Sequence, residues 1–256
     1  MTQAVALITG ASAGLGVDFA RQLSAKGRRL VLVARRKDRI DALAAELGNA
    51  RAILADLSLP DASGRLMADL ADHDEHVELL VNNAGFGLAG RFAKLDPKQQ
   101  RRMIDLNCGA LAELAHAVLP AMIERRLGAI LNVASTAAFQ PGPGMAVYFA
   151  TKAFVLSFSE ALHEEVRKDG VIVTALCPGP TATEFGEIAG FKPSGPSARI
   201  FVDMAADSAS VVKAGLEGLE KGRAIVIPGA MNKSTAQAHR FLPRSWIRKA
   251  AGSLKP

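Results

Sequence analysis

Tyr148 and Lys152 have the residue types and the spacing that most directly suggest catalysis in this chain. They lie four residues apart, so a helix would place both on one face. A phenol with its usual pKa of ~10 is a poor acid or base at neutral pH, and a neighbouring ammonium lowers that pKa because it favours the phenolate. Lys152 can supply this charge, and Ser135 can donate a hydrogen bond that holds a substrate oxygen against Tyr148. The three residues predict proton transfer at a substrate oxygen.

A glycine-rich turn near the start of the chain suggests a second kind of chemistry. An apolar strand-like run, Val5–Thr9, leads into glycines with the spacing Gly-x-x-x-Gly-x-Gly, and a helical pattern follows. Glycine permits positive φ and close backbone approach, and a helix N-terminus offers free N–H groups to a pyrophosphate. We therefore predict a dinucleotide at this turn, in contact with Gly10, Ser12, Ala13, Gly14, Leu15 and Gly16.

The end of the second strand indicates which dinucleotide binds. A carboxylate there would hold the ribose hydroxyls of NAD, but the chain continues as Arg35-Arg36-Lys37. Basic residues are mildly unfavourable at a helix N-terminus and suit a 2′-phosphate. We predict NADP, with Arg35 as the main contact and Arg36 as the second. Asp56 and Leu57, just beyond the third strand, are expected to meet the adenine.

The elements that must position these residues form a regular alternation of short apolar runs and longer helical patterns. The runs are nearly continuously apolar, as strands covered by helices on both faces require. This pattern predicts an α/β fold: a single doubly wound Rossmann-type domain with a seven-stranded parallel sheet. The strands are expected at Val5–Thr9, Arg29–Ala34, Arg51–Ala55, Glu78–Asn82, Gly128–Val133, Val171–Leu176 and Ala224–Ile227. The helices are expected at Gly14–Lys26, Lys37–Leu47, Pro60–Ala71, Gln99–Arg125, Ala146–Arg167 and Ser208–Lys221.

A long irregular stretch, residues 178–207, interrupts the alternation. A loop of this length in a compact domain is usually functional, and we predict that it borders the substrate. Aromatic and aliphatic side chains in this loop and in loops near Tyr148 indicate a mainly apolar substrate pocket. Packing within the loop is the alternative role for these residues, which are Phe86, Phe139, Met145, Phe185, Ile188 and Phe191.

Six motifs in order resemble the short-chain dehydrogenase/reductase family over nearly the whole chain. They are Thr9-Gly10-x-x-x-Gly14-x-Gly16, Asn82-Asn83-Ala84-Gly85, Asn107, Ser135, Tyr148-x-x-x-Lys152 and Pro178-Gly179. The segment Ala34-Arg35-Arg36 resembles the single-domain, NADP-preferring branch. This resemblance implies hydride transfer between a nicotinamide and a carbonyl or secondary alcohol carbon.

The resemblance also implies roles for individual residues. Tyr148 would be the general acid or base, Ser135 the oxygen stabiliser, and Lys152 the group that tunes the pKa and binds the ribose. Asn107 would hold a water that joins Lys152 to solvent. Further cofactor contacts would come from Asn83, Ala84, Gly85, Pro178, Gly179, Thr181 and Thr183.

Two other functions compete with a reductase. A catalytically silent dinucleotide-binding regulator or scaffold could keep the same fold, although Asn107, Ser135, Tyr148 and Lys152 are all present. An epimerase or dehydratase would also use Tyr-x-x-x-Lys, but the glycine spacing and the lack of a larger C-terminal substrate domain count against it. NADP preference favours the reductive direction.

Composition and charge exclude several other classes of protein. Of the 256 residues, 49% are hydrophobic and 22% charged, which excludes global disorder. The net charge of +6 arises within residues 231–256, so no basic face for nucleic acid is expected on the main domain, residues 1–230. Cys108 and Cys177 lack the partners of a zinc site, and no metal is predicted. With reduced thiols and no signal peptide, a cytoplasmic location is expected.

The basic tail, residues 231–256, predicts a short amphipathic helix that begins near Pro243. Trp246, Ile247, Ala250 and Leu254 would share its apolar side. Docking on this protein or its oligomer is favoured over contact with an anionic membrane surface, which six unopposed cations also permit. The fourth and fifth helices carry long apolar faces, and the resemblance implies that these helices pair across a twofold axis, so a homodimer or homotetramer is expected.

Overall fold

A computed structural model describes residues 2–190, 205–238 and 241–253. Its centre is one parallel sheet with the strand order β3-β2-β1-β4-β5-β6-β7. The chain moves outward from β1 in one direction, returns to β4 and then moves outward in the other direction, which is the doubly wound topology predicted above. The strands are β1 (Gln3–Thr9), β2 (Leu30–Ala34), β3 (Ala50–Leu54), β4 (Glu75–Asn82), β5 (Gly128–Val133), β6 (Val171–Leu176) and β7 (Ile225–Val226).

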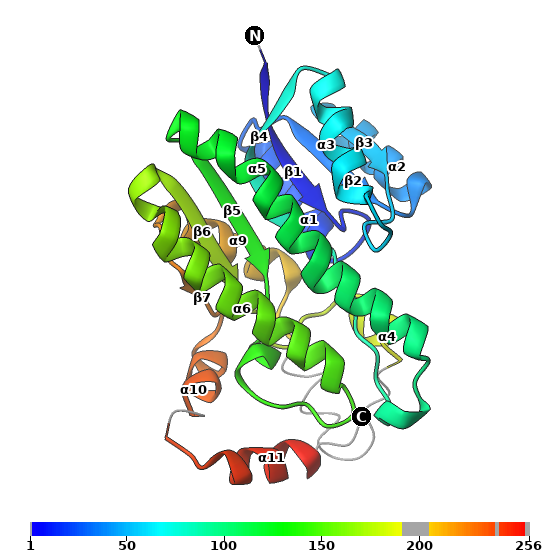
Figure 1. The fold of residues 1–256 in the computed structure, drawn as a ribbon, viewed down its shortest axis with the longest axis vertical. Coiled ribbons are helices and arrows are strands. Elements are labelled where there is room, and N and C mark those ends of the chain that lie inside the picture. The colour runs from blue at the N-terminus through cyan, green and yellow to red at the C-terminus, as the bar shows by residue number, and fades with distance from the viewer. Residues whose placement is uncertain (1, 191–204, 239–240, 254–256) are drawn as a thin grey trace.

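Helices cover both faces of this sheet (Figure 1). The alternation along β1 decides which side chains meet which layer: Leu7 packs into one core cluster and Ile8 into the other. The Leu7 side holds α3 (Ala62–Asp72), α5 (Leu111–Arg125) and α6 (Ala146–Val166). The opposite side holds α1 (Leu15–Ala25), α2 (Lys37–Leu47) and α9 (Ser208–Glu220).

The fourth expected helix is continuous from Pro97 to Arg125 but not uniform. It consists of α4 (Pro97–Ile104), a π-helical turn η2 (Asp105–Ala110) and α5. By length and composition this helix could cross a membrane, but its apolar side chains Leu114, Val118 and Met122 belong to the core. Short 3₁₀ segments occur at η1 (Phe92–Lys94), η3 (Thr136–Phe139) and η4 (Arg167–Asp169).

The largest differences from the predicted elements are at the C-terminal end. Strand β7 has only two residues, and the tail forms two helices, α10 (Ala230–Ala238) and α11 (Arg244–Ser253), where one was predicted. Trp246 is 64% exposed in the single chain, whereas Ile247 is half-buried. The helix α11 docks on this chain: Ala251 lines the main cavity, and Gly252 lies beside Pro143.

The parallel arrangement brings the carboxyl ends of all strands to one edge. The strand arrows point to the end of the molecule where α4 and α11 lie (Figure 1). Apart from Asn107, which lies within the helix from Pro97 to Arg125, every predicted site residue follows a strand or lies in the first turns of the helix that comes next, so the fold brings these segments to the same edge.

Candidate active site

A cavity of ≈ 1120 Å³ opens at this edge. Its volume exceeds the ~300–1000 Å³ typical of a single small-molecule pocket, so it has room for two ligands side by side. Gly16 and Asn107 are outside its lining. All other predicted site residues line it: Gly10, Ser12, Ala13, Gly14, Leu15, Arg35, Arg36, Asp56, Leu57, Asn83, Ala84, Gly85, Ser135, Tyr148, Lys152, Pro178, Gly179, Thr181 and Thr183.

The glycine turn forms a cradle that larger residues would fill. Gly10 and Gly14 have φ of 67° and 52°. A Cβ atom on Gly14 would lie 2.9 Å from Thr183 Cγ2, and one on Gly16 would lie 2.2 Å from the Gly10 carbonyl oxygen. Gly16, in the first turn of α1, therefore packs closely against Gly10 and does not line the cavity, and its contact with a cofactor stays a prediction. Among the described residues no side chain caps α1, which leaves its N-terminus able to hold an anion.

Asn83 and Thr9 fasten this turn to the neighbouring strand. Asn83 Nδ2 donates to the carbonyl oxygens of Thr9 and Gly10 at 2.9 and 3.2 Å. Thr9 Oγ1 accepts from the backbone N–H groups of Asn83 and Ala84 at 3.1 and 3.0 Å. The turn is thus held in place by side chains and does not have to be ordered by a ligand.

Arg35 and Arg36 form the predicted binding site for the 2′-phosphate, called the 2′-phosphate corner below. One of the two guanidinium groups is freer than the other to bind an anion. Arg35 has a 57% exposed side chain and an ion pair with Asp56 at 3.9 Å. Arg36 Nε donates to Ser12 Oγ at 3.1 Å, and its Nη1 donates to Glu184 at 2.9 Å. Arg35 is therefore the guanidinium freer to take a new anion.

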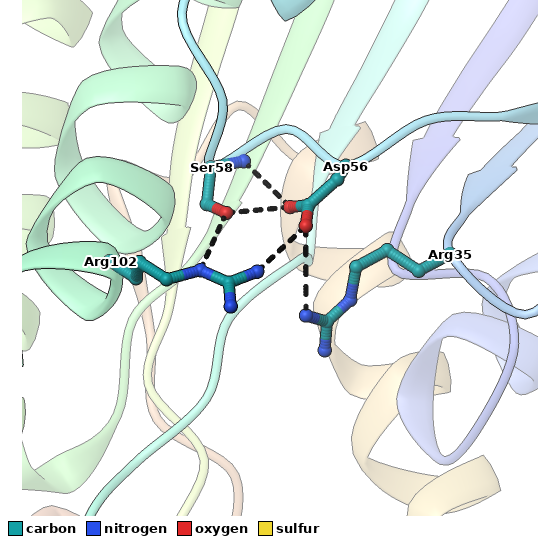
Figure 2. A network of polar contacts seen from close by, with 4 residues as sticks. All are labelled: Arg35, Asp56, Ser58 and Arg102. Carbon is teal, nitrogen blue, oxygen red and sulfur yellow. Dashed lines mark hydrogen bonds and ion pairs between the residues drawn. The ribbon is translucent and has the colours of Figure 1, made fainter. Parts of the chain in front are cut away.

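Asp56 is held by a network that the sequence analysis did not include (Figure 2). Arg102 Nη2, from α4, donates to Asp56 Oδ2 at 2.8 Å, and the backbone and hydroxyl of Ser58 donate to Oδ1 at 3.1 and 2.6 Å. Burial opposes ionisation of Asp56, but the Ser58 hydrogen bonds and the charges of Arg35 and Arg102 outweigh it and lower its pKa. Asp56 is thus a fixed carboxylate at the rim of the cavity.

Ser135, Tyr148 and Lys152 meet at the other end of the cavity. Ser135 Oγ donates to the Pro178 carbonyl oxygen at 3.4 Å and accepts from Ala137 N at 3.1 Å, and it is close enough to Tyr148 to affect the pKa of that phenol. The buried Lys152 donates through Nζ to the Val133 carbonyl oxygen at 2.7 Å and lies 5.8 Å from the centre of the Tyr148 ring. The three side chains come from the end of β5 and the first two turns of α6, as the spacing predicts.

Burial shifts the pKa values of Tyr148 and Lys152 in opposite directions. Burial raises the pKa of Tyr148 to about 12, although the Ser135 hydrogen bond opposes the shift. Burial lowers the pKa of Lys152 to about 8. Burial outweighs any effect of Lys152 on the pKa of Tyr148 in the chain without ligands, and the Lys152 ammonium is directed at the Val133 carbonyl oxygen. That Lys152 lowers the pKa of Tyr148 during the reaction stays a prediction. Tyr148 is a protonated phenol at neutral pH.

Asn107 acts on the site from outside the cavity lining. It lies in the π-helical turn η2, and such turns are frequent at functional sites. Its Nδ2 donates to the Phe86 carbonyl oxygen and to Thr151 Oγ1, both at 3.0 Å, and its Oδ1 accepts from Phe86 N at 3.1 Å. Thr151 in turn donates to the Tyr148 carbonyl oxygen at 2.7 Å. Asn107 therefore ties the loop after β4 to the helix that carries Tyr148 and Lys152.

A buried polar chain that the sequence analysis missed anchors the same helix. Asn82 Nδ2 donates to Asn132 Oδ1 at 3.0 Å, and Asn132 Nδ2 donates to Ser159 Oγ at 2.9 Å. Unsatisfied polar groups are costly in a core, so these bonds fix α6 against β4 and β5. The only signal in the sequence was the presence of asparagines within apolar strands.

Apolar side chains surround Tyr148. The rings of Tyr148 and Phe185 have centres 5.2 Å apart. Phe86, Met145, Phe185 and Ile188 line the cavity as predicted, together with Phe149, which was not predicted. Phe139 instead lines a second cavity beside α11, and Phe191 lies outside the described residues.

Several known proteins are similar to this chain. A family model described as short chain dehydrogenase matches residues 4–189. A short-chain dehydrogenase from Sphingobium yanoikuyae in complex with NADPH has a TM-score of 0.82 and 35% identity, over 93% of this chain and 94% of that one. The 3-ketoacyl-(acyl-carrier-protein) reductase from Brucella melitensis complexed with NADH has a TM-score of 0.76 and 28% identity, over 88% and 95% of the two chains. Sulfoacetaldehyde reductase 2 of Chromohalobacter salexigens is 40% identical over 186 residues, which are 71% of this chain and 74% of that protein.

Proposed function

The chain belongs to the short-chain dehydrogenase/reductase family, and from this membership we propose that it is an NADP(H)-dependent reductase of ketones or aldehydes with mainly apolar substituents. Membership of this family indicates an oxidoreductase that acts on carbonyl or alcohol groups. The proposal of an NADP(H)-dependent reductase depends on one observation: the glycine turn, Arg35 and the Ser135–Tyr148–Lys152 group all line one cavity.

The residues present fit a nicotinamide dinucleotide. The space beside Gly10 and Gly14 is too tight for a Cβ, and the N-terminus of α1, which no described side chain caps, begins at this turn and has free N–H groups for a pyrophosphate. The exposed guanidinium of Arg35 supports NADP over NAD, and no carboxylate ends β2. Lys152, Asn83 and Thr183 would complete the cofactor contacts. When bound, the dinucleotide would supply the hydride.

Side chains of the protein would bind the substrate oxygen, transfer the proton and exclude water. Ser135 would donate a hydrogen bond to the substrate oxygen, and Tyr148 would give that oxygen its phenolic proton. The buried ammonium of Lys152 would stabilise the resulting phenolate. Phe185 and its apolar neighbours would exclude water from this end of the cavity. Burial raises the pKa of Tyr148 to about 12, so the phenol keeps its proton at neutral pH and can act as the proton donor that reduction requires.

A panel assay tests the reaction class. Purified protein with NADPH should oxidise the cofactor in the presence of ketones or aldehydes that carry aromatic or aliphatic groups. Absorbance of the reduced nicotinamide gives the rate, and product analysis shows the alcohol. A protein that binds NADPH but is inactive across a broad panel would favour a scaffold role, and a product isomeric with its substrate would favour an epimerase.

We expect Arg35→Ala to erode the preference for NADPH over NADH. The substitution removes a charge-assisted phosphate contact, worth roughly 1.5–3 kcal/mol, and leaves NADH binding nearly unchanged. Titration of both cofactors measures the effect, and Arg29→Ala, which is also an exposed arginine but lies outside the cavity lining, serves as the control. Equal affinity of the wild type for the two cofactors would contradict the assignment of Arg35.

The protein is further proposed to be a homodimer or homotetramer that pairs through α4 and α6. Phe154 on α6 is 43% exposed and stacks in parallel on Phe158, with ring centres 5.8 Å apart, and Ile104 on α4 is also exposed. Apolar groups exposed on adjoining helices suit a twofold contact. Light scattering at micromolar concentration should give a multiple of the 26.9 kDa chain mass, and Phe154→Glu should lower that mass. A monomeric wild type would refute this assembly.

A further inference from the structure

The loop after β6 crosses the glycine turn and ends in an ion-pair cluster at the 2′-phosphate corner. Thr183 lies against Gly14, because a Cβ on that glycine would be 2.9 Å from Thr183 Cγ2. The next residue, Glu184, lines the cavity just before the short helix α7 (Phe185–Ile188). Three segments distant in sequence therefore meet here: the glycine turn, the start of α2 and the loop that precedes Phe185.

Glu184 forms ion pairs with two arginines, Arg36 and Arg39. Arg36 Nη1 donates to its Oε2 at 2.9 Å, and Arg39 Nη1 donates to its Oε1 at 2.7 Å. The hydrogen bonds from Arg36 and Arg39 lower the pKa of Glu184 and so favour its carboxylate form. The guanidinium groups that could add charge behind Arg35 are thus already paired with an anion.

We propose that Glu184 is a further determinant of cofactor choice, which limits the affinity for a 2′-phosphate by holding Arg36 and Arg39 in ion pairs. The inference rests on the proposed dinucleotide site but not on the reaction or its substrate. A 2′-phosphate that binds Arg36 must displace or approach the Glu184 carboxylate, and this costs binding energy that a ribose hydroxyl does not lose. The effect is therefore specific to the phosphorylated cofactor.

Asp56 does not have the same effect on the corner. Its charge is already met by Arg102 and by two Ser58 hydrogen bonds, and its contact with Arg35 is long at 3.9 Å. Glu184 has shorter contacts and reaches the corner from a separate loop. Substitution of Glu184 consequently changes the charge near Arg36 without altering the network around Asp56.

The test compares Glu184→Gln with the wild type by calorimetric titration of NADPH and NADH. We expect the dissociation constant of NADPH to fall about fivefold, the scale set by exposed ion pairs, and that of NADH to stay within about twofold. The gain should shrink as salt is raised from about 0.05 to 0.5 M, since the freed arginines act through charge.

Glu46→Gln is the matched control. Glu46 lies on α2 itself, accepts from Arg21 Nε and Nη2 at 2.8 and 3.1 Å, and is outside the lining of the cavity. The control removes the same charge and the same type of pair, so it should change neither dissociation constant. Melting temperatures verify that both variants remain folded.

The outcomes separate this inference from the proposed function. A wild type that binds NADPH and NADH equally would count against the NADP assignment, yet a gain for NADPH alone in Glu184→Gln would still support the role of Glu184. Unchanged or weaker NADPH binding in Glu184→Gln would overturn it. So would an equal change for both cofactors, which would indicate a structural effect on the loop.

Discussion

Tyr148→Phe should reduce turnover by two or more orders of magnitude while the protein remains folded and binds NADPH. The substitution removes one oxygen from a buried side chain whose ring contacts Phe185, so the packing of the cavity wall persists. What is lost is the proton that the phenol would give to the substrate oxygen, and general acid catalysis typically contributes ~10²–10⁴-fold. Steady-state rates, together with the dissociation constant of NADPH, measure the two parts of this prediction.

The melting temperature and the NADPH affinity of Tyr148→Phe itself serve as the controls. An unchanged melting temperature and an NADPH affinity within about twofold of the wild type would show that only the chemical step is affected. If the variant kept more than a tenth of the wild-type turnover, Tyr148 could not be the proton donor. Loss of NADPH binding would instead mean that Tyr148 is needed to form the cofactor site.

Lys152→Met is expected to lower kcat/KM by about two orders of magnitude or more, because the phenolate left on Tyr148 would lose its only buried cation among the described residues. The substitution also changes the pH dependence of stability. Burial lowers the pKa of Lys152 from its usual 10.5 to about 8. Between these values the unfolded chain holds a proton at Lys152 that the folded chain has lost, so the free energy of unfolding rises with pH.

Urea denaturation without cofactor at pH 7.5 and 9.5 tests the second part. The wild type should gain about 2 kcal/mol relative to Lys152→Met over this interval, from roughly 1.4 kcal/mol per pKa unit. Lys213→Met, the same substitution at an exposed position on α9, should alter neither the rate nor the pH dependence. Parallel stability curves for the wild type and Lys152→Met would contradict a buried, titrating ammonium.

Much of the fold is readable from the sequence because it depends on local patterns. The bounds of α2, β5 and β6 agree with the predicted ranges, since each is a clear helical period or a continuous apolar run between turn residues. The long helix was located but its π-helical turn was not, because one extra residue in a turn leaves no mark on hydrophobic periodicity. The two-residue strand β7 and the helix α10 show the same weakness, since short elements at the edge of a fold carry little pattern.

The sequence by itself determined the types of chemistry and the segments that carry them: the glycine turn, the arginines after β2, and Ser135, Tyr148 and Lys152. Only the tertiary structure decided how these groups are paired and charged. Arg102 reaches Asp56 across 46 residues, and Arg36 reaches Glu184 across 148. No local pattern encodes such contacts, because packing of the whole chain brings the partners together. The pKa of Tyr148 was decided in the same way, since desolvation depends on every atom that surrounds a group and not on the residue four positions away.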